Sequence, residues 1–469
     1  MPRSAAPLHI AALADQRVAI WGFGREGRAA ITALRLRLPQ HPLTLFCTAA
    51  EMAAAHAFDA ALDVRTDEPD AAALAAFDVV IKSPGISAYK PALLAAAKLG
   101  TRFTSGTALW FGEHRLGNPS VDDGGQAPVI AVTGTKGKST TSAMIAHLAR
   151  ALGVRTALAG NIGMPLLELL DQSAELWVIE LSSFQTGEAG ALELGVITSL
   201  YEEHLDWHGS RERYVADKLK LTQVAQQLLV NAQQPTLLAC TEDHPHRLSF
   251  GKPEGWHVDD SFIRRGTRDV FPVEQLVAPG LHNALNACAA LAALAAVGMD
   301  ALAAASALAN FRPLPHRLQP LGEHDGFHWI NDSISTMPMA TLAAMESLHG
   351  RQVTVLVGGH DRGLDWSGFV DAVAENPPWA IICSGANGPR IATALHDAHV
   401  VTEIALVDDL DAAVALARKL TPAGGCVLLS PGAPSFDQFR DYAERGRHFA
   451  DLAGFDGNAI TGIEGLGIG

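Results

Sequence analysis

The residue types best suited to chemistry stand together in one short run, Thr133–Thr140, which reads TGTKGKST. This run follows an apolar segment, Val129–Val132, expected to be a buried strand, and it opens a helix predicted to begin near Lys138. In such a turn, glycines let backbone N–H groups point at phosphate oxygens, and the helix N-terminus adds partial positive charge. Lys138 can then reach the outer phosphates of a nucleotide, and Ser139 can ligate Mg²⁺. The match to GxxxxGK[ST] is imperfect at Val132, so a flexible surface loop is the alternative.

A second glycine run, Gly22–Gly27, reads GFGREG and follows the apolar segment Arg17–Trp21. It fits the GxGxxG pattern of dinucleotide sites, which also need an acid about 20 residues later for the ribose hydroxyls. The next predicted strand ends at Phe46–Thr48 without an acid. The pattern therefore disfavours NAD and leaves two possibilities, a diphosphate at the helix N-terminus or a tight turn without ligand.

Acidic residues follow two further predicted strands. Glu180 ends the apolar run that starts at Leu176, so it is expected at the carboxyl edge of a sheet, where a carboxylate beside a phosphate loop could ligate Mg²⁺. Taken alone, Glu180 could equally cap a helix. Three acids and His204 stand within Glu202–Asp206, just after the predicted strand Gly195–Leu200. They could serve a hard cation or form a charged, solvated loop.

Other polar residues are uninformative when each is taken alone. Lys218 and Lys220, in the segment Tyr214–Leu221, would ordinarily be solvated helix lysines. The sets Pro315–Arg317 and Asn331–Ser333 lie next to a predicted linker and at a predicted strand end.

Strands alternating with Ala-rich helical segments predict an α/β fold in three blocks, residues 1–103, 104–311 and 312–469. The third block begins near FRPLPHR, Phe311–Arg317, whose prolines suit an interdomain linker. The Gly-rich tail after Phe455 is predicted to be disordered.

Composition excludes several classes of protein. The chain has 469 residues, 48% hydrophobic and 18% charged, with a net charge of −15. A chain this acidic is an unlikely partner for nucleic acid. Five scattered cysteines without a CxxC pair indicate a reducing, cytoplasmic setting and no structural zinc. The Ala-rich stretch Ala284–Leu308 predicts a packed, interrupted helix and no membrane span.

The order of these motifs along the chain resembles the Mur ligase superfamily, and within it the MurD branch. The resemblance covers about residues 17–452. It rests on the motifs TGTKGKST, NIG, ELSSFQ, EEHLD, GLHNALNA, LPHR and INDS, with Lys218 between the fourth and the fifth. SPGI and LLSPGAPSFDQF point to the MurD branch.

The resemblance implies three domains: a Rossmann-like N-terminal domain for the uridine nucleotide substrate, a central P-loop ATPase-type domain, and a Rossmann-like C-terminal domain for the amino acid. It implies an ATP-dependent ligase of peptidoglycan precursor synthesis, and so of cell wall biogenesis, cell shape and cell division. Such a ligase joins glutamate to UDP-N-acetylmuramoyl-L-alanine through an acyl phosphate and releases ADP and phosphate. Two Mg²⁺ ions are expected.

The resemblance also implies roles for single residues. The catalytic set is Lys138, Glu180, His204 and Lys218. The Mg²⁺ ligands are Ser139, Glu180, His204 and Lys218, the last after carbamylation by CO₂. ATP contacts are expected at Gly134, Thr135, Lys136, Gly137, Lys138, Ser139, Thr140, Asn283, Asn286, Arg317 and Asp332. Contacts with the uridine nucleotide substrate are expected at Gly22, Phe23, Gly24, Arg25, Thr48, Ser83, Pro84, Gly85 and Asn161.

The expected glutamate site departs from the family pattern. Its residues by resemblance are Thr336, Arg362, Ser435, Phe436 and Tyr442. Relatives that add D-glutamate have lysines where this chain has Ile334 and Arg362. This pattern resembles a MurD-related subfamily that adds L-glutamate and whose product is then converted by a separate epimerase. Addition of D-glutamate is the alternative. The expected site for the uridine nucleotide departs from the family pattern as well, because Cys47 stands where relatives often have an acid.

Two functions of other classes are alternatives to the ligase. An NAD-dependent oxidoreductase built on GFGREG conflicts with the missing ribose acid and the intact TGTKGKST. A catalytically dead nucleotide-binding regulator conflicts with the presence of all four residues of the catalytic set. Folylpolyglutamate synthase shares the central domain, but SPGI and the N-terminal block favour a uridine nucleotide substrate.

Overall fold

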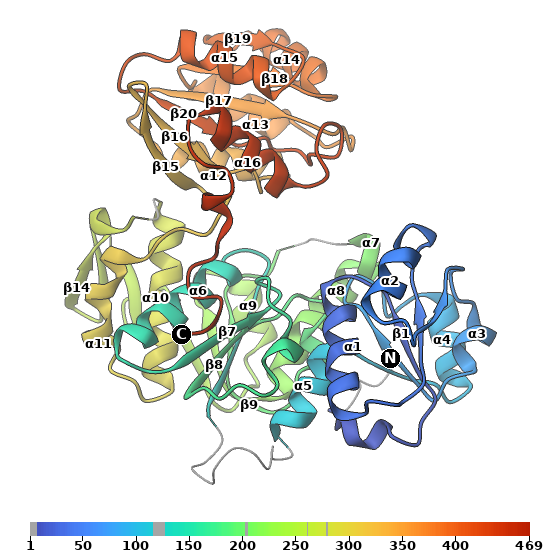
Figure 1. The fold of residues 1–469 in the computed structure, drawn as a ribbon. Coiled ribbons are helices and arrows are strands. Elements are labelled where there is room, and N and C mark those ends of the chain that lie inside the picture. The colour runs from blue at the N-terminus through green and yellow to red at the C-terminus, as the bar shows by residue number, and fades with distance from the viewer. Residues whose placement is uncertain (1–6, 116–126, 202–204, 260, 278–279) are drawn as a thin grey trace. The chain divides into compact units, whose positions relative to one another are not determined.

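Three large sheets, each mainly parallel, organise the structure, which is a computed structural model that describes residues 7–115, 127–201, 205–259, 261–277 and 280–469. Figure 1 shows their strands alternating with helices along the chain. The prediction of an α/β fold is confirmed. The parallel strands read as continuous apolar runs and are buried along most of their length, as expected where helices cover both faces of a sheet.

The N-terminal sheet has five parallel strands in the order β3-β2-β1-β4-β5. Helix α1 lies against one face, and α3 and α4 lie against the other (Figure 1). Strand order reverses between β1 and β4, so the loops that follow these two strands lie side by side. The elements are β1 (Val18–Trp21), α1 (Arg25–Arg37), β2 (Leu43–Phe46), α2 (Met52–Phe58), β3 (Asp63–Arg65), α3 (Ala71–Ala75), β4 (Val79–Lys82), α4 (Pro91–Lys98), β5 (Arg102–Thr104) and α5 (Gly106–Arg115).

The central sheet has the strand order β11-β10-β9-β6-β8-β7-β21. A separate antiparallel sheet, β12-β13-β14, follows it in the chain. The strands are β6 (Val129–Thr133), β7 (Thr156–Gly160), β8 (Leu176–Glu180), β9 (Leu192–Ile197), β10 (Ala225–Asn231), β11 (Arg247–Phe250), β12 (Trp256–Asp259), β13 (Phe262–Arg265), β14 (Arg268–Pro272) and β21 (Gly467–Ile468). The helices are α6 (Lys138–Ala151), α7 (Leu205–His208), α8 (Arg211–Lys218), α9 (Pro235–Cys240), α10 (Leu281–Ala296) and α11 (Ala301–Ala304).

The C-terminal sheet has the order β15-β16-β20-β17-β18-β19 and is parallel except at the β15–β16 edge. Helices α12, α13 and α14 pack on one face, and α15 and α16 pack on the other. The elements are β15 (Gln319–His324), β16 (Phe327–Asn331), α12 (Pro338–Glu346), β17 (Val353–Gly358), α13 (Ser367–Glu375), β18 (Ala380–Ser384), α14 (Gly388–Asp397), β19 (Glu403–Leu406), α15 (Leu410–Leu420), β20 (Cys426–Leu429) and α16 (Tyr442–Leu452).

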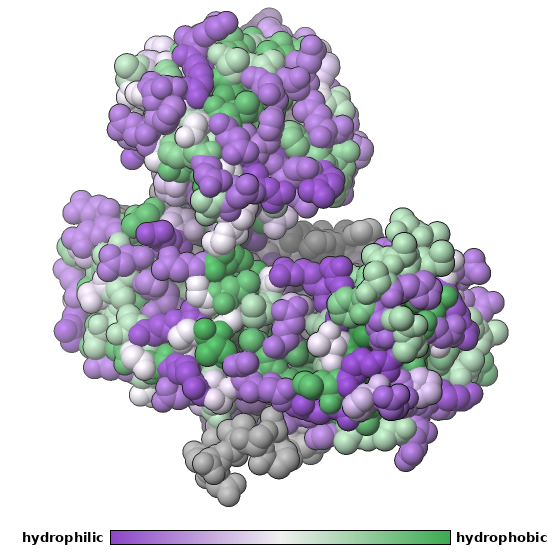
Figure 2. Space-filling model, viewed as in Figure 1, coloured by the Kyte–Doolittle hydropathy of each residue, from purple (hydrophilic) through white to green (hydrophobic). Residues whose placement is uncertain are grey.

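The chain forms two compact units. The first comprises residues 1–274, 285–308 and 465–469, and the second comprises residues 275–284 and 309–464. The first unit therefore holds both the N-terminal and the central sheet, and the boundaries at residues 103 and 311 remain predictions. Figure 2 shows hydrophilic residues interspersed with hydrophobic ones over the visible face of each unit. Among the described residues, no helix is both long and apolar enough to cross a membrane.

The C-terminal tail corrects the prediction of disorder after Phe455. Residues Gly467 and Ile468 form β21, which pairs antiparallel with the edge strand β7 (Figure 1). Gly467 has a φ of +88°, a conformation that few residues other than glycine adopt. Arg150 donates from Nη2 to the carbonyl oxygens of Thr156, at 2.7 Å, and of Gly467, at 3.1 Å. The tail thus covers an edge that would otherwise expose unpaired backbone groups.

We expect a chain that lacks residues 463–469 to lose on the order of 3–6 °C in Tm. In that chain β7 loses its backbone pairing with β21, and Arg150 loses the Gly467 carbonyl as an acceptor. Arg150→Ala should give a smaller loss in the same direction. The measurement is thermal unfolding followed by circular dichroism.

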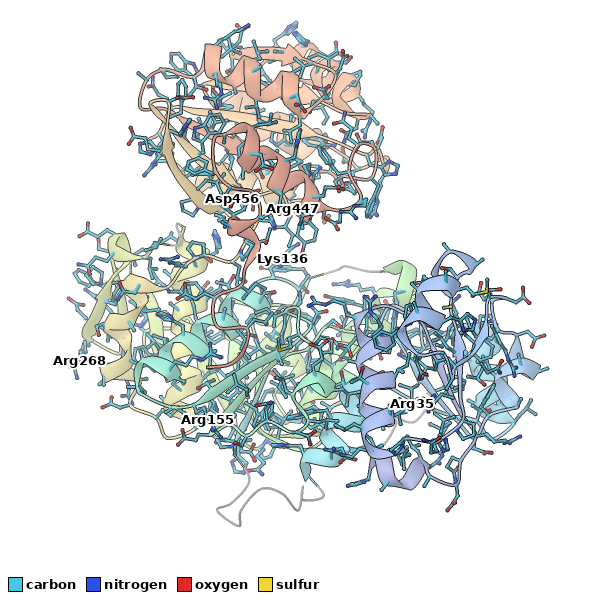
Figure 3. The ribbon with its side chains drawn as sticks, in the orientation of Figure 1. Arg35, Lys136, Arg155, Arg268, Arg447 and Asp456 are labelled. Carbon is cyan, nitrogen blue, oxygen red and sulfur yellow. The ribbon has the colours of Figure 1, made fainter. Side chains whose placement is uncertain are left out.

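The matched control is Arg155→Ala. Arg155 is exposed, and it is labelled in Figure 3. Its guanidinium bonds Ser173 and not the tail. This variant should unfold at the wild-type temperature, and an unchanged Tm in the truncated chain would show that β21 adds nothing to stability.

Candidate active site

The loop between β6 and α6 is shaped by hydrogen bonds from the end of β9. The Lys136 amide donates to Ser199 Oγ at 2.7 Å, and the Thr135 amide donates to the Ser199 carbonyl at 2.9 Å. Thr198 Oγ1 donates to the Lys136 carbonyl at 2.6 Å. Figure 3 shows Lys136 at this end of the central sheet, and its side chain is exposed. The predicted strand, loop and helix are confirmed, and α6 begins at Lys138.

Two glycines of this loop cannot carry a side chain. Gly134 has a φ of +152°, and a Cβ there would lie 2.0 Å from Thr198 Oγ1. Gly137, the N-cap of α6, has a φ of +86°, and a Cβ there would lie 2.5 Å from Asn286 Oδ1. Thr141 Oγ1 also donates to Asn286 Oδ1, at 3.4 Å. The structure therefore brings Asn286, predicted to contact ATP, against the loop.

The predicted phosphate ligands stand at the start of α6. Lys138 is half-buried, and its Nζ donates to the Thr135 carbonyl within the same loop at 3.3 Å. Ser139 is buried in the first turn of the helix, and Thr140 follows it. An ammonium group and a helix N-terminus at the same point favour phosphate oxygens.

Glu180 lies on the strand next to the phosphate loop. Its Cα pairs with that of Val132 in the β6–β8 register, and its side chain is fully buried. Asn161 Nδ2 donates to Glu180 Oε1 at 2.7 Å, whereas Glu180 Oε2 is buried and has no hydrogen-bond partner among the residues that the structure describes. A buried carboxylate oxygen without a partner is costly unless a cation or donor reaches it. The arrangement suits a metal ligand.

Lys218 is also buried, with 1% of its surface exposed. The expectation of a solvated helix lysine is therefore wrong for this residue, whereas Lys220 is half-buried. Lys218 Nζ lies 5.0 Å from the centre of the Tyr214 ring, and the Tyr214 hydroxyl lies 2.7 Å from Thr135 Oγ1. Tyr214 thus links the phosphate loop to Lys218. The predicted metal ligand His204, with Glu202 and Glu203, lies outside the described residues.

The two loops predicted to hold the uridine nucleotide meet at the point where the N-terminal strand order reverses. Gly22 has a φ of +102°, and a Cβ there would lie 2.6 Å from Ser83 Oγ. Pro84 is half-buried and Gly85 is exposed. Ligands of open α/β sheets bind at such a point. Gly24 is the N-cap of α1, and Arg25 beside it is exposed.

Two other residues predicted at this site have structural partners. The Phe23 ring is 4% exposed and packs edge-on against Phe58, so only its backbone faces the loop. Thr48 caps a short 3₁₀ helix, where its amide and hydroxyl both donate to Glu51 Oε2, at 2.9 and 2.8 Å. Their contacts with a nucleotide stay predictions.

In the second unit, Arg317 lies within a strained segment that is bound by Asp332. Asp332 Oδ1 accepts from the Leu318 amide at 3.0 Å, Oδ2 accepts from Ser430 Oγ at 2.8 Å, and burial raises the pKa of this carboxyl to about 6. His316 and Leu318 both have positive φ, 62° and 41°, on either side of Arg317. Strain of this kind persists where the surroundings fix a functional conformation. Asn283, in α10, is buried.

The predicted glutamate residues gather at the carboxyl ends of β16, β17 and β20. Arg362 stands over the Phe436 ring, with Cζ 5.7 Å from the ring centre. Both are exposed, and so is Thr336, whereas Ser435 is 2% exposed. Tyr442 packs edge-on against His316. The structure thus forms one pair within this set, Arg362 with Phe436, and it places Tyr442 against His316 of the LPHR segment.

Two buried residues that connect these motifs, Tyr214 and Arg445, were not predicted from the sequence as site residues. Tyr214 lies four residues before Lys218 in α8, and this spacing puts both side chains on one face of the helix. The spacing could have identified Tyr214 from the sequence. Arg445 donates from Nε to Ser333 Oγ at 3.1 Å and from Nη2 to the Ala433 carbonyl at 3.0 Å, so it joins INDS to SPGAPS. Within the described part of the chain, Arg445 Nη1 has no hydrogen-bond partner. Burial lowers the pKa of Arg445 to about 10, and the side chain borders a cavity of about 20 Å³.

We expect Gly137→Ala to lower the affinity for ADP about tenfold or more, because a Cβ would meet Asn286 and an alanine would be strained at this φ. The measurement is isothermal titration calorimetry with ADP. Gly153→Ala is the control, since Gly153 ends the same helix with a φ of +81° and open space around its Cβ. Both variants should lose stability, and equal ADP affinities would refute the role of the loop.

Comparison with known proteins places this geometry in a family. The Mur ligase middle domain matches residues 132–294, and the Mur ligase glutamate ligase domain matches residues 316–432. A Xanthomonas axonopodis pv. citri protein named UDP-N-acetylmuramoyl-L-alanine--L-glutamate ligase is 50% identical over 98% of this chain and 100% of its own. A Micromonospora protein with the same name is 38% identical over 95% and 98%.

Solved structures share the fold at low sequence identity. UDP-N-acetylmuramate-alanine ligase MurC from Thermotoga maritima has a TM-score of 0.59 and 19% identity, covering 93% of this chain and 98% of its own. MurF ligase from the same organism, in complex with ADP, has a TM-score of 0.56 and 15% identity, covering 98% and 99%. With two matched domains and a full-length relative at 50% identity, the chain belongs to the Mur ligase family.

Proposed function

We propose that this chain joins glutamate, with the L isomer preferred, to UDP-N-acetylmuramoyl-L-alanine at the expense of ATP. The substrate carboxylate attacks the γ-phosphorus, the bond to ADP breaks, and an acyl phosphate forms. The glutamate amine then attacks the acyl carbon, phosphate leaves with the bonding electrons, and the amine loses a proton. Relatives that carry this activity in their name are 50% identical along the whole chain.

One observation supports the phosphoryl-transfer half most directly, namely the buried Glu180 oxygen without a partner beside the phosphate loop. The reaction brings an anionic carboxylate to an anionic triphosphate, so its rate depends on charge neutralisation and positioning. Lys138 and the N-terminus of α6 would neutralise the outer phosphates. Asn161, which bonds the other oxygen of Glu180, would stand between the metal ligand and the reacting end of the substrate.

The residues present fit Mg²⁺. Hard cations take oxygen ligands, and Ser139 and Glu180 offer them at adjoining points of the loop and the sheet. Bound Mg²⁺ would neutralise phosphate charge. Lys218 would join this set after carbamylation, in which its neutral amine attacks CO₂, an N–C bond forms and one proton leaves. The burial of this lysine supports the proposal, because a buried ammonium is costly whereas a carbamate could ligate a cation.

The incoming glutamate would bind at the carboxyl edge of the sheet in the second unit. Its carboxylates need charge-assisted partners once desolvated. Arg362 supplies a planar, bidentate donor where D-glutamate-adding relatives have an ammonium, and Ile334 removes a second cation. This redistribution is what a change in the positions of the two carboxylates would require. The choice of L-glutamate itself rests on the resemblance to relatives named for that isomer. An epimerase that inverts the glutamyl α-carbon would then act on the product.

We place the reaction in the cytoplasm. ATP and the uridine nucleotide substrate are cytoplasmic metabolites, and the five cysteines are free thiols as expected in a reducing compartment.

The isomer is tested by measuring kcat/KM for L- and D-glutamate separately, with UDP-N-acetylmuramoyl-L-alanine, ATP and Mg²⁺. We expect L-glutamate to be preferred about tenfold or more. Lys138→Ala serves as the inactive control and should lose on the order of 10²–10³-fold in rate. A preference for D-glutamate would refute the isomer and leave the ligase standing, whereas no product with either would refute the ligase.

Lys218→Ala should be nearly inactive, because the metal site loses an anionic ligand, and a short carboxylate such as acetate should restore part of the rate. The carbamate itself is tested by ¹³C NMR on enzyme equilibrated with ¹³C-bicarbonate. We expect a carbamate resonance that is missing in Lys218→Ala and present in Lys220→Ala. A wild-type spectrum without it would contradict the carbamate.

A further inference from the structure

A buried carboxylate joins the N-terminal domain to helix α8, the helix that ends at Lys218. Asp217 is 4% exposed. Its oxygens accept hydrogen bonds from the Tyr89 hydroxyl, at 2.8 and 2.9 Å, and Lys220 Nζ lies 2.6 Å away. His208 Nδ1 lies 2.7 Å from Oδ2. One carboxylate therefore fixes groups from three segments of the chain.

The same network reaches the loop that follows Glu180. His208 is fully buried, and its Nε2 lies 3.0 Å from Ser183 Oγ. Thr186 Oγ1 donates to the Asp217 carbonyl at 2.7 Å. The order serine, histidine, aspartate resembles a hydrolase triad, but with Ser183 only 5% exposed no substrate can reach it. The network therefore holds the end of α8 against the Glu180 loop.

Its other end lies on the loop Ser83–Lys90, whose first three residues are predicted to bind the uridine nucleotide. We call this segment the substrate loop. Tyr89 belongs to this loop. Ser87 Oγ donates to the Trp207 carbonyl at 2.7 Å, and Trp207 Nε1 donates to the Pro84 carbonyl at 3.2 Å. Trp207 lies on α7, directly before α8. The substrate loop is thus attached to α7 and α8 at several points.

The start of the substrate loop is anchored as well. Lys82, the residue before it, pairs with Glu188 at 3.2 Å, and both side chains are buried. Glu188 ends the short helix that begins at Thr186, the residue that bonds the Asp217 carbonyl. A shift of the substrate loop relative to the central sheet must therefore strain Asp217 through Tyr89 or through Thr186.

We propose that Tyr89 and Asp217 are positioning residues that make the placement of α8, and of Lys218 on it, depend on ligand occupancy of the substrate loop. The inference rests on the proposed function, because it takes UDP-N-acetylmuramoyl-L-alanine as the ligand of that loop. Stability alone does not require such a network, since well-packed apolar side chains often serve as well. A buried, charge-assisted network instead specifies one geometry, and it couples the two ends that it joins.

The test measures amide hydrogen exchange of the whole chain with and without UDP-N-acetylmuramoyl-L-alanine. In the wild type, the ligand should slow exchange both in the substrate loop and in α8. In Tyr89→Phe, which removes one hydroxyl, protection of the substrate loop should persist while protection of α8 falls by about half or more. Asp217→Asn should behave in the same way.

Kinetics supply a second readout. Tyr89→Phe should lower kcat about tenfold and Asp217→Asn about 10- to 100-fold, because each loses a hydrogen bond to a charged group, while KM for ATP stays unchanged. The double variant should be no worse than Asp217→Asn, since both act through one contact. Asp59→Asn is the control: this mostly buried carboxylate pairs with Arg35 of α1 at 2.7 Å and should change neither readout (Figure 3).

The outcomes separate the inference from the function on which it rests. Unchanged protection of α8 in Tyr89→Phe, or additive losses of kcat in the double variant, would overturn the inference while the ligase stands. If Asp217→Asn fails to fold, Tyr89→Phe alone decides between these results. A wild-type chain whose substrate loop gains no protection would refute the assigned substrate, and the inference with it.

Discussion

A fully buried carboxylate with one unpartnered oxygen is the constraint on which the first unit depends. Glu180 Oε1 is held by Asn161, but Oε2 faces no donor among the described residues. In a low-dielectric interior such an oxygen destabilises the fold unless a cation is bound there. The phosphate loop beside it is built for anions, so a cation between the two satisfies both. The proposed nucleotide and metal would together remove this cost.

Parallel strands explain how motifs scattered along the chain meet. In the first unit the loops after β1 and β4 adjoin, and so do those after β6, β8 and β9. In the second unit the same holds for β16, β17 and β20, which bring INDS, the GGHDR turn and SPGAPS to one edge. Most of the predicted site residues that the structure describes end or follow a strand. The exceptions include Arg317, which precedes β15, and Lys218, Asn283 and Asn286, which lie on helices. The polar chemistry therefore stays at strand ends while the apolar strands form the core.

The sequence predicted the elements that glycine and apolar patterns mark, and missed what ordinary residue types do. The β6 strand, the start of α6 at Lys138 and the strand that ends in Glu180 agree with the structure. Asp217 and Arg445 could not be found, because a charged residue on a helix is usually solvated and only tertiary packing buries it. The tail was mispredicted because glycine suggests disorder, yet β21 pairs through backbone groups that need no side chain.

The positions of the departures from the family pattern agree with the proposed preference for L-glutamate, because the two half-reactions make different use of glutamate. Phosphoryl transfer from ATP involves no atom of glutamate, so a change of isomer does not alter the residues that this step requires. In agreement, TGTKGKST, Glu180 and Lys218 are retained. Amide formation uses the same amine and the same acyl carbon for either isomer. The isomers differ only in where two carboxylates lie once that amine is placed. A change of stereochemistry must therefore appear as a rearrangement of cations around the carboxylates. Ile334 and Arg362 lie in the second unit, at the sheet edge where that rearrangement is expected, while the first unit keeps the family's phosphate loop.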